Sequence, residues 1–447
     1  MDIKMTEDKK LAEKIAYEVK RFGGQTYYVG GCVRDGLLGI ESKDIDIEIH
    51  GIERDVLEKI LDSVGGRTEF GKSFGVYGIK GYGLDIALPR SERRTGFGHR
   101  DFDVTADPFI GTLRAAERRD FTVNAMMRDV LSGELTDHFG GRKDLENRIL
   151  RHVSGKTFAD DPLRVLRAAQ FSARFGFDVD PGTAELCRKI SLSDLSRERV
   201  FAETEKALLK SSRPSVFFEF LRSVGHLAVW FSELEQTIGV QQDQRYHPEG
   251  DVWTHTMQVL DRCAEYRNST LYPLGFMMSA VCHDFGKPVC TVTTGTGMHS
   301  YGHETAGLPL AETFIRRLTD ERALRDYVLN LVEHHMKPGV LAVSNASVKS
   351  SNRMFDEVSD PDALVFLSLS DGGHDDKKAA YLSDRLAVYR EYMSRPYVTG
   401  QDLIQAGLDP SEHFSEYLKY AHKLRLAGIS RENALKQTLG VAKKQKK

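Results

Sequence analysis

The sequence predicts an α+β protein in which a small α/β head with a mixed sheet is followed by helical segments. Up to about residue 147, short apolar or alternating runs are separated by Gly, Ser and Lys, which is the pattern of strands and turns. Beyond that point apolar residues recur every three or four positions, as in amphipathic helices. With 447 residues, the chain is long enough for several domains of about 100–200 residues each.

Composition narrows the class of protein. Hydrophobic residues make up 40% and charged residues 28%, which is typical of a globular protein. The net charge of -3 gives no global sign of nucleic-acid binding, although basic residues cluster at 89–100, at 113–120 and in the terminal KKQKK. The five cysteines are scattered and include no C-x-x-C pair, so we expect a reducing, cytoplasmic compartment. No stretch approaches the roughly 20 apolar residues of a membrane span, so no membrane partner is expected.

The elements of the head follow in order. The charged, amphipathic N-terminus predicts a helix rather than a signal peptide. Four strands are expected in TYYVGG, DIDIEIHG, FGVYGIKG and GLDIALP, and a helix in RDVLEKILDSVGG. The Gln- and Asp-rich QQDQR at 241–245 marks a boundary after which histidine becomes frequent. We therefore predict four domains: a head (1–147), a helical neck and body (148–240), a histidine-rich helical domain (241–395) and a helical C-terminal segment (396–447).

Two aspartates share one face of the second predicted strand. Side chains at i and i+2 project to the same side, so Asp44 and Asp46 point together while isoleucines alternate with them. Two adjacent carboxylates are unfavourable unless a cation lies between them, which favours a metal site over a solvated edge strand. Asp85, on a later strand, either joins this pair or is a surface acid.

A glycine turn precedes this strand. Gly30 and Gly31 follow the first strand and begin a helical stretch, so their backbone N–H groups could face a phosphate. Arg34, one turn later, adds a forked donor for the same anion, although a simple tight turn is an alternative. The turn and the aspartates together indicate a nucleotide with Mg²⁺.

GGCVRD followed by DIDIE resembles the first motif of the nucleotidyltransferase superfamily, in the branch of bacterial tRNA CCA-adding enzymes and poly(A) polymerases. Later motifs of that branch match RRDFTVNAM, DHFGGRKDL, DDPLRVLRAAQF and RERVFAETEKAL in the same order. The resemblance implies an enzyme that adds CMP and AMP from CTP and ATP to tRNA 3′ ends. It also implies that Asp44 and Asp46 hold Mg²⁺, and that Gly31, Arg34 and Arg119 contact the nucleotide.

The nucleobase would be read by Asp161 and Arg164, which we expect on one face of one helix. A carboxylate accepts the exocyclic amine of cytosine or adenine, whereas uracil and guanine present a carbonyl there. Arg167 and Gln170 complete this predicted nucleotide-binding set, with Gln170 and Asp160 standing where the family has a basic residue and Glu. These departures leave an A-adding enzyme, a CC-adding enzyme and a poly(A) polymerase as alternatives.

YHPEGDVWTHTM, AVCHDFGKP and LSLSDGG resemble the pattern of metal-dependent HD phosphohydrolases. The resemblance implies that His255, His283, Asp284 and Asp371 hold a transition metal such as Ni or Mn, with His303 and His335 able to hold a second ion. It implies phosphatase or 2′,3′-cyclic phosphodiesterase activity. An alternative of another class is an HD phosphohydrolase whose head only binds RNA. The last segment resembles a tail of long family members and predicts a tRNA contact, while a monomer and a homodimer both stay open.

Overall fold

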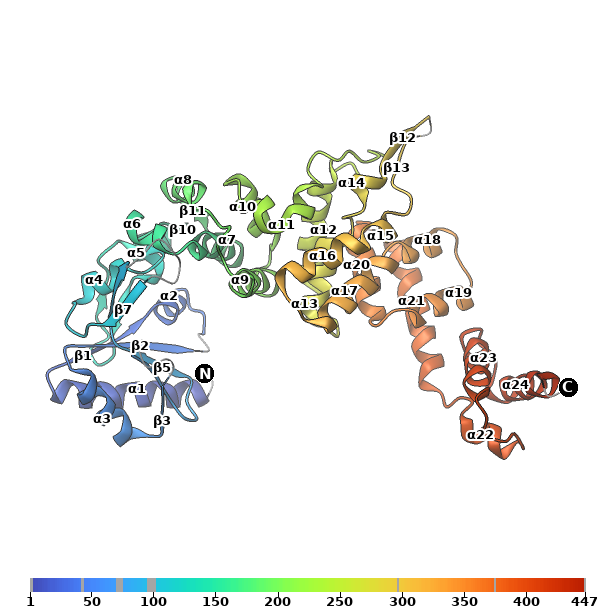
Figure 1. Cartoon of the computed structure of the whole chain (residues 1–447), viewed down its shortest axis with the longest axis horizontal. Coiled ribbons are helices and arrows are strands. Elements are labelled where there is room, and N and C mark those ends of the chain that lie inside the picture. The colour runs from blue at the N-terminus through green and yellow to red at the C-terminus, as the bar shows by residue number, and fades with distance from the viewer. Residues whose placement is uncertain are drawn as a thin grey trace. The chain divides into compact units, whose positions relative to one another are not determined.

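The computed structural model describes residues 3–41, 44–69, 75–94, 102–295, 297–373 and 375–445. The chain forms two compact units (Figure 1): the first comprises Met1–Glu203 with Glu219–His226, and the second comprises Thr204–Phe218 with Leu227–Lys447. The predicted fold class is confirmed, with one mixed sheet near the N-terminus and mostly helices after it. The four predicted domains divide the chain more finely, and their bounds stay predictions. Among the described residues, no helix has the length and apolar character needed to cross a bilayer.

A seven-stranded sheet forms the centre of the first unit, in the order β3-β4-β5-β2-β1-β8-β9. Only the pairing of β2 with β5 is parallel, and all other neighbours in this sheet are antiparallel. The predicted strands correspond to β1, β2, β4 and β5. The seven strands are β1 (Gln25–Val29), β2 (Ile45–His50), β3 (Arg67–Glu69), β4 (Val76–Ile79), β5 (Leu84–Ala87), β8 (Met127–Asp129) and β9 (Leu135–Thr136).

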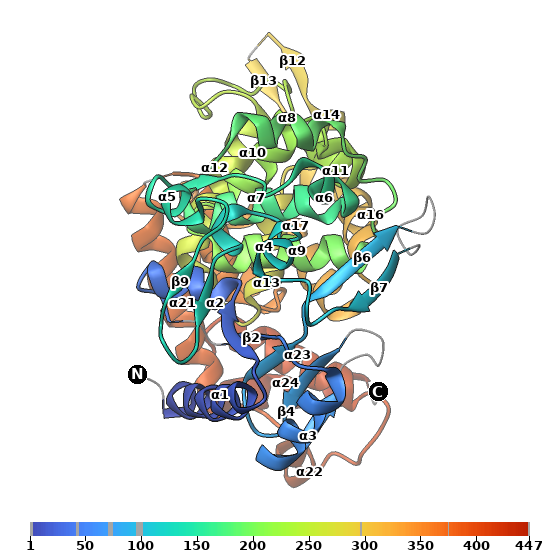
Figure 2. The same ribbon diagram turned by 90° about the vertical axis from the view of Figure 1, so that its left-hand side faces the viewer.

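Two helices cover one face of this sheet, α1 (Ile3–Arg21) and α3 (Arg54–Val64), as Figures 1 and 2 show. Their apolar stripes and the isoleucines of β2 form one buried cluster that includes Ile15, Ile47 and Leu61. Because alternate residues of a strand face opposite sides, burying Ile45 and Ile47 turns Asp44 and Asp46 to the other face. The hydrophobic pattern therefore decides where the acidic side chains point.

The rest of the first unit is mostly helical. The hairpin of β6 (Arg90–Arg94) and β7 (Phe102–Ala106) forms a separate two-stranded sheet, and the basic cluster at 89–100 lies partly outside the described residues. The remaining elements up to residue 223 are α2 (Gly31–Leu37), α4 (Thr112–Glu117), η1 (Thr122–Asn124), α5 (Gly141–Glu146), β10 (Ile149–Leu150), α6 (Gly155–Asp160), α7 (Leu163–Phe175), β11 (Asp178–Val179), α8 (Pro181–Lys189), α9 (Arg197–Lys210) and α10 (Ser215–Ser223).

The prediction that Asp161 and Arg164 lie on one helix is wrong. Helix α6 ends at Asp160 and α7 begins at Leu163, while Asp161 has an extended backbone with φ -123° and ψ 102°. The cause is Pro162, because a proline ring clashes with a helical conformation of the residue before it. Asp161 therefore projects from a break between two helices.

The second unit is a helical bundle with one small hairpin of strands, β12 and β13. The helices that carry the predicted metal ligands are α12, α13, α15, α17 and α20. Its elements are α11 (Leu227–Glu235), α12 (Val252–Tyr266), η2 (Arg267–Ser269), α13 (Pro273–Cys282), α14 (Lys287–Cys290), β12 (Val292–Thr294), β13 (Gly297–His299), α15 (His303–Ala306), α16 (Leu308–Leu318), α17 (Arg322–His334), α18 (Lys337–Val343), α19 (Val348–Asp356), α20 (Pro361–Asp371), α21 (Asp376–Ser394), α22 (Gly400–Gln405), α23 (Phe414–Leu426) and α24 (Arg431–Gln445).

Candidate active sites of the two units

The first candidate site lies where β2 and β5 run in parallel. Asp46 of β2 is in register with Asp85 of β5, and Asp44 directly precedes β2. Burial raises the pKa of Asp46, and the negative charges of Asp85 and Asp44 raise it further against the opposing effect of Arg119. Burial and Asp44 also raise the pKa of Asp85. A cation between these carboxylates would relieve their repulsion, so the three side chains fit a hard divalent ion.

A glycine turn packs against these carboxylates. Gly30 has φ +68°, a backbone conformation that side-chain-bearing residues rarely adopt. A Cβ atom at Gly30 would lie 3.2 Å from Nη1 of Arg119 and 3.7 Å from Oδ2 of Asp46. Gly31 begins α2, and a Cβ there would lie 3.5 Å from Nη2 of Arg34. The turn thus brings backbone close to two guanidinium groups, as a phosphate cradle requires, and to one carboxylate of the candidate cation site.

Arg119 is anchored by a buried acid that the sequence did not single out. Its Nη2 lies 3.3 Å from Oε2 of Glu48, whose Oε1 lies 2.9 Å from Nε2 of His50. Burial alone would raise the pKa of Glu48, but the hydrogen bond with His50 and the charge of Arg119 lower it instead. Glu48 lies two residues after Asp46 on the same strand face, so the alternation that identified Asp46 also pointed to it.

Arg34 is buried inside the first unit. It donates to Oδ1 of Asp35 at 2.8 and 2.6 Å and to Oδ1 of Asn124 at 2.6 Å. Its guanidinium carbon also lies 4.4 Å from the ring centre of Phe175. In this conformation Arg34 ties α2 to η1 and α7, and its predicted contact with phosphate stays a prediction.

In the structure, the residues predicted to read the base contact other residues of the chain. Oδ2 of Asp161 accepts from Nη2 of Arg199 at 2.8 Å, while Arg164 donates to the backbone oxygens of Thr157 at 2.7 Å and Arg118 at 2.5 Å. Arg167 donates to Asp120 at 2.7 Å. The side chain of Gln170 is buried, and its Nε2 makes no hydrogen bond within the described residues. The backbone N–H of Arg164 also donates to the backbone oxygen of Asp161 at 3.0 Å.

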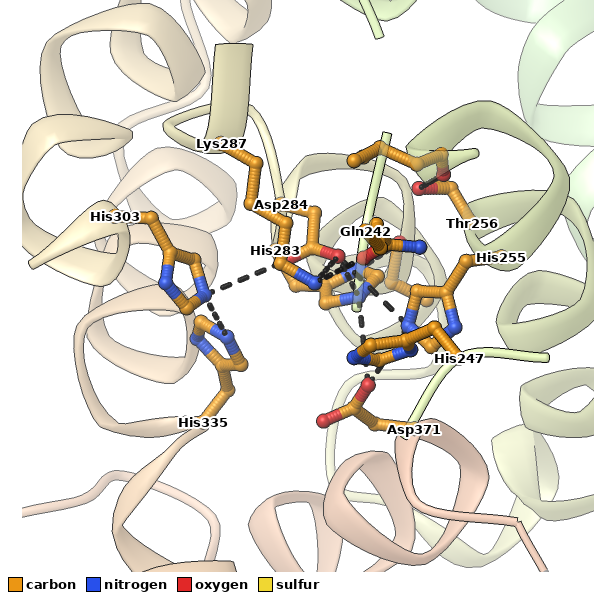
Figure 3. A network of polar contacts seen from close by, with 12 residues as sticks. Gln242, His247, His255, Thr256, His283, Asp284, Lys287, His303, His335 and Asp371 are labelled. Carbon is orange, nitrogen blue, oxygen red and sulfur yellow. Dashed lines mark hydrogen bonds and ion pairs between the residues drawn. The ribbon is translucent and has the colours of Figure 1, made fainter. Parts of the chain in front are cut away.

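The second candidate site brings six predicted ligands together (Figure 3). Nε2 of His255, on α12, lies 2.8 Å from Oδ1 of Asp371 at the end of α20. Asp284, directly after α13, places Oδ2 3.3 Å from Nε2 of His283 and Oδ1 3.2 Å from Nε2 of His303 on α15. Nε2 of His335, which follows α17, lies 3.1 Å from Nε2 of His303. The structure thus brings these six residues together.

Hydrogen bonds orient the four imidazoles of this cluster. Nδ1 of His283, His303 and His335 lies 2.8, 2.7 and 2.7 Å from the backbone oxygens of Ala280, Ser300 and Val332, and Nδ1 of His255 lies 2.6 Å from Glu249. Because a carbonyl or carboxylate oxygen only accepts, each Nδ1 carries a proton and each Nε2 is directed into the cluster, where it has a free lone pair whenever the imidazole is neutral. This is the usual arrangement of metal-binding histidines.

The cluster fits a metal ion by its chemistry. Nε2 of His303 and His335 face each other at 3.1 Å, so a proton or a cation has to lie between two lone pairs. Nε2 of His283 is buried without a hydrogen-bond partner in the described residues. Among the described residues, three groups have all their ligand atoms within 4.8 Å of one another. They are His255, His283 and Asp371; Asp284, His303 and His335; and His247, Glu249 and His255. Imidazole with carboxylate suits transition metals, and the two oxygens of Asp284 face the first two groups.

Two histidines of the cluster have pKa values that are shifted in opposite directions. Burial disfavours protonation of His255, but hydrogen bonds to Asp371 and Glu249 raise its pKa to about 9. Burial, together with His283 and His303, lowers the pKa of His335 to about 3, which keeps this imidazole neutral as a metal ligand requires.

Among the described residues, the three groups of potential metal ligands all lie in the second unit. The carboxylates of Asp44, Asp46 and Asp85 in the first unit lie farther apart than the ligand atoms of these groups.

Sequence reasoning missed three residues of this network. His247 and Glu249 form a third metal-type group with His255, and Nδ1 of His247 lies 3.0 Å from Oε1 of Glu249. Both belong to the YHPEGDVWTHTM stretch, so their proximity was the available signal. Gln242 accepts from Nζ of Lys287 at 2.7 Å, and the same Nζ lies 2.7 Å from Oδ2 of Asp284. Lys287 is thus buried beside the cluster.

Comparisons with known proteins cover most of the chain. A model of the poly A polymerase head domain matches residues 26–151, and a model named "Probable RNA and SrmB-binding site of polymerase A" matches residues 176–238. The chain is 36% identical over 318 residues to the multifunctional CCA protein of Actinobacillus pleuropneumoniae serotype 5b (strain L20), covering 70% of this chain and 75% of that protein. It is also 36% identical over 395 residues to that of Pasteurella multocida (strain Pm70), covering 85% and 91%.

Solved structures share the fold at lower identity. The Thermotoga maritima CCA-adding enzyme complexed with tRNA has a TM-score of 0.67 and 21% identity, covering 99% of this chain and 96% of that one. The Bacillus stearothermophilus CCA-adding enzyme in complex with CTP has a TM-score of 0.64 and 19% identity, covering 100% and 99%. At these identities, the likeness shows the fold alone.

Proposed function

The chain belongs to the family of multifunctional CCA proteins, and from this membership we propose that it is a template-independent tRNA nucleotidyltransferase. It adds CMP and AMP, from CTP and ATP, to the 3′ end of tRNA. The observation that carries this proposal is the pairing of Asp46 with Asp85 beside the Gly30 turn and Arg119. That arrangement offers a cation site and an anion site side by side, which nucleotidyl transfer needs.

The chain's own residues position the reactants. Asp44 and Asp46, with Asp85 beside them, would hold Mg²⁺, which when bound would activate the RNA 3′-hydroxyl and stabilise charge on the departing pyrophosphate. Backbone N–H groups at Gly30 and Gly31 face the triphosphate, and Arg119, anchored by Glu48, donates to it. The 3′-oxygen attacks the α-phosphorus, the bond to the β-phosphate oxygen breaks, and pyrophosphate leaves. The rate enhancement comes from positioning of the reactants and from stabilisation of charge in the transition state.

Nucleobase choice rests on Asp161 and Arg164. Asp161 accepts the exocyclic amine of cytosine or adenine, and Arg164 donates to the neighbouring ring acceptor. For this, Asp161 exchanges its contact with Arg199, and Arg164 exchanges its contacts with two backbone oxygens. Uracil or guanine would leave the carboxylate facing a carbonyl, which costs about 1–3 kcal/mol or more for a charged group.

Incorporation on defined tRNAs tests this proposal. Three synthetic tRNAs ending before CCA, after C and after CC are incubated with Mg²⁺ and CTP, ATP or both. We expect two C and then one A, followed by a stop, and no incorporation by Asp46→Asn. Addition of A alone to the CC-ending tRNA would make the protein an A-adding enzyme, and C alone a CC-adding enzyme. Long A tails on unrelated RNA would indicate a poly(A) polymerase.

A second activity is favoured by the histidine cluster. We propose that residues 241–395 form an HD-type phosphohydrolase domain, which removes terminal phosphates or opens 2′,3′-cyclic phosphates. The supporting observation is that four imidazoles present Nε2 to Asp284 and Asp371 while their Nδ1 atoms are tied elsewhere. His255, His283, Asp284 and Asp371 would hold one transition metal, and His303 with His335 a second. A metal held by these residues would supply activation of water at neutral pH.

Metal content and hydrolysis test the second activity together. The protein loaded with Ni²⁺ or Mn²⁺ is assayed on 2′,3′-cyclic AMP, and bound metal is counted after dialysis. We expect His283→Ala to lose both bound metal and hydrolysis while keeping tRNA incorporation. Hydrolysis without any incorporation by the parent protein would instead favour an HD phosphohydrolase whose head only binds RNA.

A further inference from the structure

A basic groove lies between α18, α19 and α23 of the second unit. Two cavities of about 620 and 1030 Å³ form it, and both are lined by Lys349, Arg353 and Glu357, so they are continuous. Lys337 lines the smaller cavity, and Lys419 and Lys423 line the larger one. We call this surface the basic groove. Neither candidate active site described above includes these residues.

The charge of the basic groove is net positive. Its two central acids are engaged, Asp356 with Nε2 of His422 at 2.8 Å and Glu357 with Nζ of Lys337 at 2.6 Å. Lys349 and Arg353 are exposed and form no ion pair within the described part of the chain, and the same holds for Lys419 and Lys423. Four cations are therefore available to an anionic ligand.

The spacing of these cations suits a chain of phosphates. Lys349 and Arg353 lie four residues apart on α19, and Lys419 and Lys423 lie four apart on α23. Side chains at this spacing lie on one helix face with Cβ atoms about 5–6 Å apart. The groove thus presents two rows of two cations, one from each wall, which fits an extended polyanion better than one small anion.

The two walls are fixed to each other. Nδ2 of Asn352, buried in α19, donates to the backbone oxygen of Leu426 in α23 at 3.0 Å. The Asp356–His422 pair adds a second link between the same helices. Arg425 joins α23 to the end of α21 by donating to the backbone oxygen of Met393 at 2.7 Å. The basic groove therefore lies between helices that are held together by hydrogen bonds and an ion pair.

The lining also offers flat and apolar surface. Tyr420 lines the larger cavity. Val340 and Met336 line the smaller one with 61% and 39% of their surface exposed. Cations beside an aromatic ring are what proteins use to bind single nucleic-acid strands, because the cations contact phosphates and the ring contacts a base.

One end of the groove lies beside the histidine cluster. Glu304 and Met336 line the smaller cavity, and each directly follows a cluster residue, His303 and His335 respectively. A strand lying in the groove would therefore have its end next to the group formed by Asp284, His303 and His335.

We propose that the basic groove binds a single RNA strand and leads its phosphate-bearing 3′ end to the histidine cluster. The proposal rests on the phosphohydrolase function proposed above and names its substrate class: a polynucleotide end rather than a free mononucleotide. Lys349, Arg353, Lys419 and Lys423 bind the backbone phosphates, and Tyr420 contacts a base.

Crosslinking locates the bound strand independently of hydrolysis. A 12-nucleotide RNA with a 3′-terminal phosphate and 4-thiouridine near that end is irradiated with the metal-loaded full chain, and the crosslinked peptides are identified by mass spectrometry. We expect peptides from α18, α19 and α23, and their loss in the double variant Lys349→Glu with Arg353→Glu. Crosslinks confined to the first unit, or displacement of the RNA by an acidic peptide of equal charge, would overturn the proposal.

Hydrolysis of two different substrates distinguishes the role of the basic groove from that of the histidine cluster. We expect the double variant to lower kcat/KM about tenfold or more on the phosphate-ended RNA and less than about twofold on 2′,3′-cyclic AMP. The matched control is Arg322→Glu with Lys377→Glu, which changes the charge equally at exposed positions outside the groove. An equal loss of kcat/KM on both substrates, or no loss on the RNA, would contradict the proposed role of the basic groove. If the parent protein hydrolyses neither substrate, the phosphohydrolase proposal fails, and the crosslinks alone decide the groove.

Discussion

Glu48 shows how one buried acid shapes the first site. It lies between Arg119 and His50 and contacts both, at 3.3 and 2.9 Å. We expect Glu48→Gln to raise the KM for nucleotide about tenfold while changing kcat less, because Arg119 loses a charged anchor that positions it. Steady-state incorporation with varied ATP measures this.

The control for this substitution is Glu58→Gln, which removes one carboxylate from the same unit at a distance from the turn. A merely structural role for Glu48 would lower the melting temperature and leave the KM unchanged. That outcome would remove Glu48 from the list of positioning residues.

Glu58 itself predicts a pH dependence of stability. An ion pair with Arg67 and a hydrogen bond from Arg54, both at 2.9 Å, lower the pKa of Glu58 from 4.5 to about 2. Because the folded-state pKa is the lower one, this stabilisation is fully present above pH 4.5 and is lost as the pH falls towards 2. We expect the Tm difference between the parent and Glu58→Gln, followed by circular dichroism, to close over this range. A constant difference would show that the charge of Glu58 contributes nothing.

Side-chain orientation was predictable only where it follows from local periodicity. The alternation of isoleucine with aspartate in DIDIE placed Asp44 and Asp46 on the face away from the core, as the burial of Ile45 and Ile47 requires. The burial of Arg34 depends on Asn124 and Phe175, which approach only in the folded chain. No pattern around residue 34 carried that information.

At the scale of elements, the break between α6 and α7 sets the direction of Asp161. We expect Pro162→Ala to let the two helices join, turning Asp161 away from its present direction and raising misincorporation of U relative to C. Competition between CTP and UTP on a tRNA ending before CCA measures the ratio. The matched control is Pro181→Ala, another proline that follows an aspartate at a helix start. Unchanged selectivity in Pro162→Ala would separate base choice from this break.

Asp360 joins three of the ligand-bearing segments of the second unit. It is fully buried, caps α20 through the N–H of Ala363 at 3.1 Å, and accepts from Leu271 N and Tyr327 Oη, each at 2.8 Å. We expect Asp360→Ala to destabilise this unit by about 3 kcal/mol, because buried donors are left without partners. Guanidinium unfolding followed by tryptophan fluorescence measures it.

The matched control is Ser347→Ala at the exposed start of α19, where the loss of a cap costs about 0.5–1 kcal/mol. Equal effects of the two substitutions would mean that the links made by Asp360 to Leu271, before α13, and to Tyr327 of α17 contribute little.

Most of the long elements were predictable from the sequence. The one wrong prediction among them, a single helix through Asp161, has an identifiable cause. Periodicity predicted β1, β2, β4, β5 and the helices α1, α3 and α7. The joined helix through Asp161 was wrong although Pro162 was visible in the sequence, because the apolar spacing of DPLRVLRAAQF outweighed a single residue in that interpretation. The approach of His247 and Glu249 to His255 depends on how a loop meets α12, which spacing alone does not give.

At the scale of the whole molecule, the two sites lie in different compact units, so they are separable. Both tryptophans of the chain, Trp230 and Trp253, belong to the second unit, and Trp253 lies two residues before His255. Tryptophan fluorescence therefore reports the unfolding of that unit. Relative to chelator-treated protein, we expect Ni²⁺ or Mn²⁺ at one hundred times its Kd to stabilise it by about 2.7 kcal/mol.

The double substitution Asp44→Asn with Asp46→Asn is expected to keep this metal effect, and His283→Ala to lose it. A metal effect that survives in His283→Ala would place the ion elsewhere than in the histidine cluster.

The parallel pairing of β2 with β5 also affects how the protein is made. Asp46 and Asp85 are brought together only after the chain has passed through α3, β3 and β4, since a parallel pair needs a crossover connection. A nascent chain that has emerged only as far as β4 carries Asp44 and Asp46 without their partner strand. An arrested or truncated translation product of that length would thus lack the third carboxylate and could not assemble this site. If the first unit acts as proposed above, its activity would appear only after this long-range contact has formed and its sheet is complete.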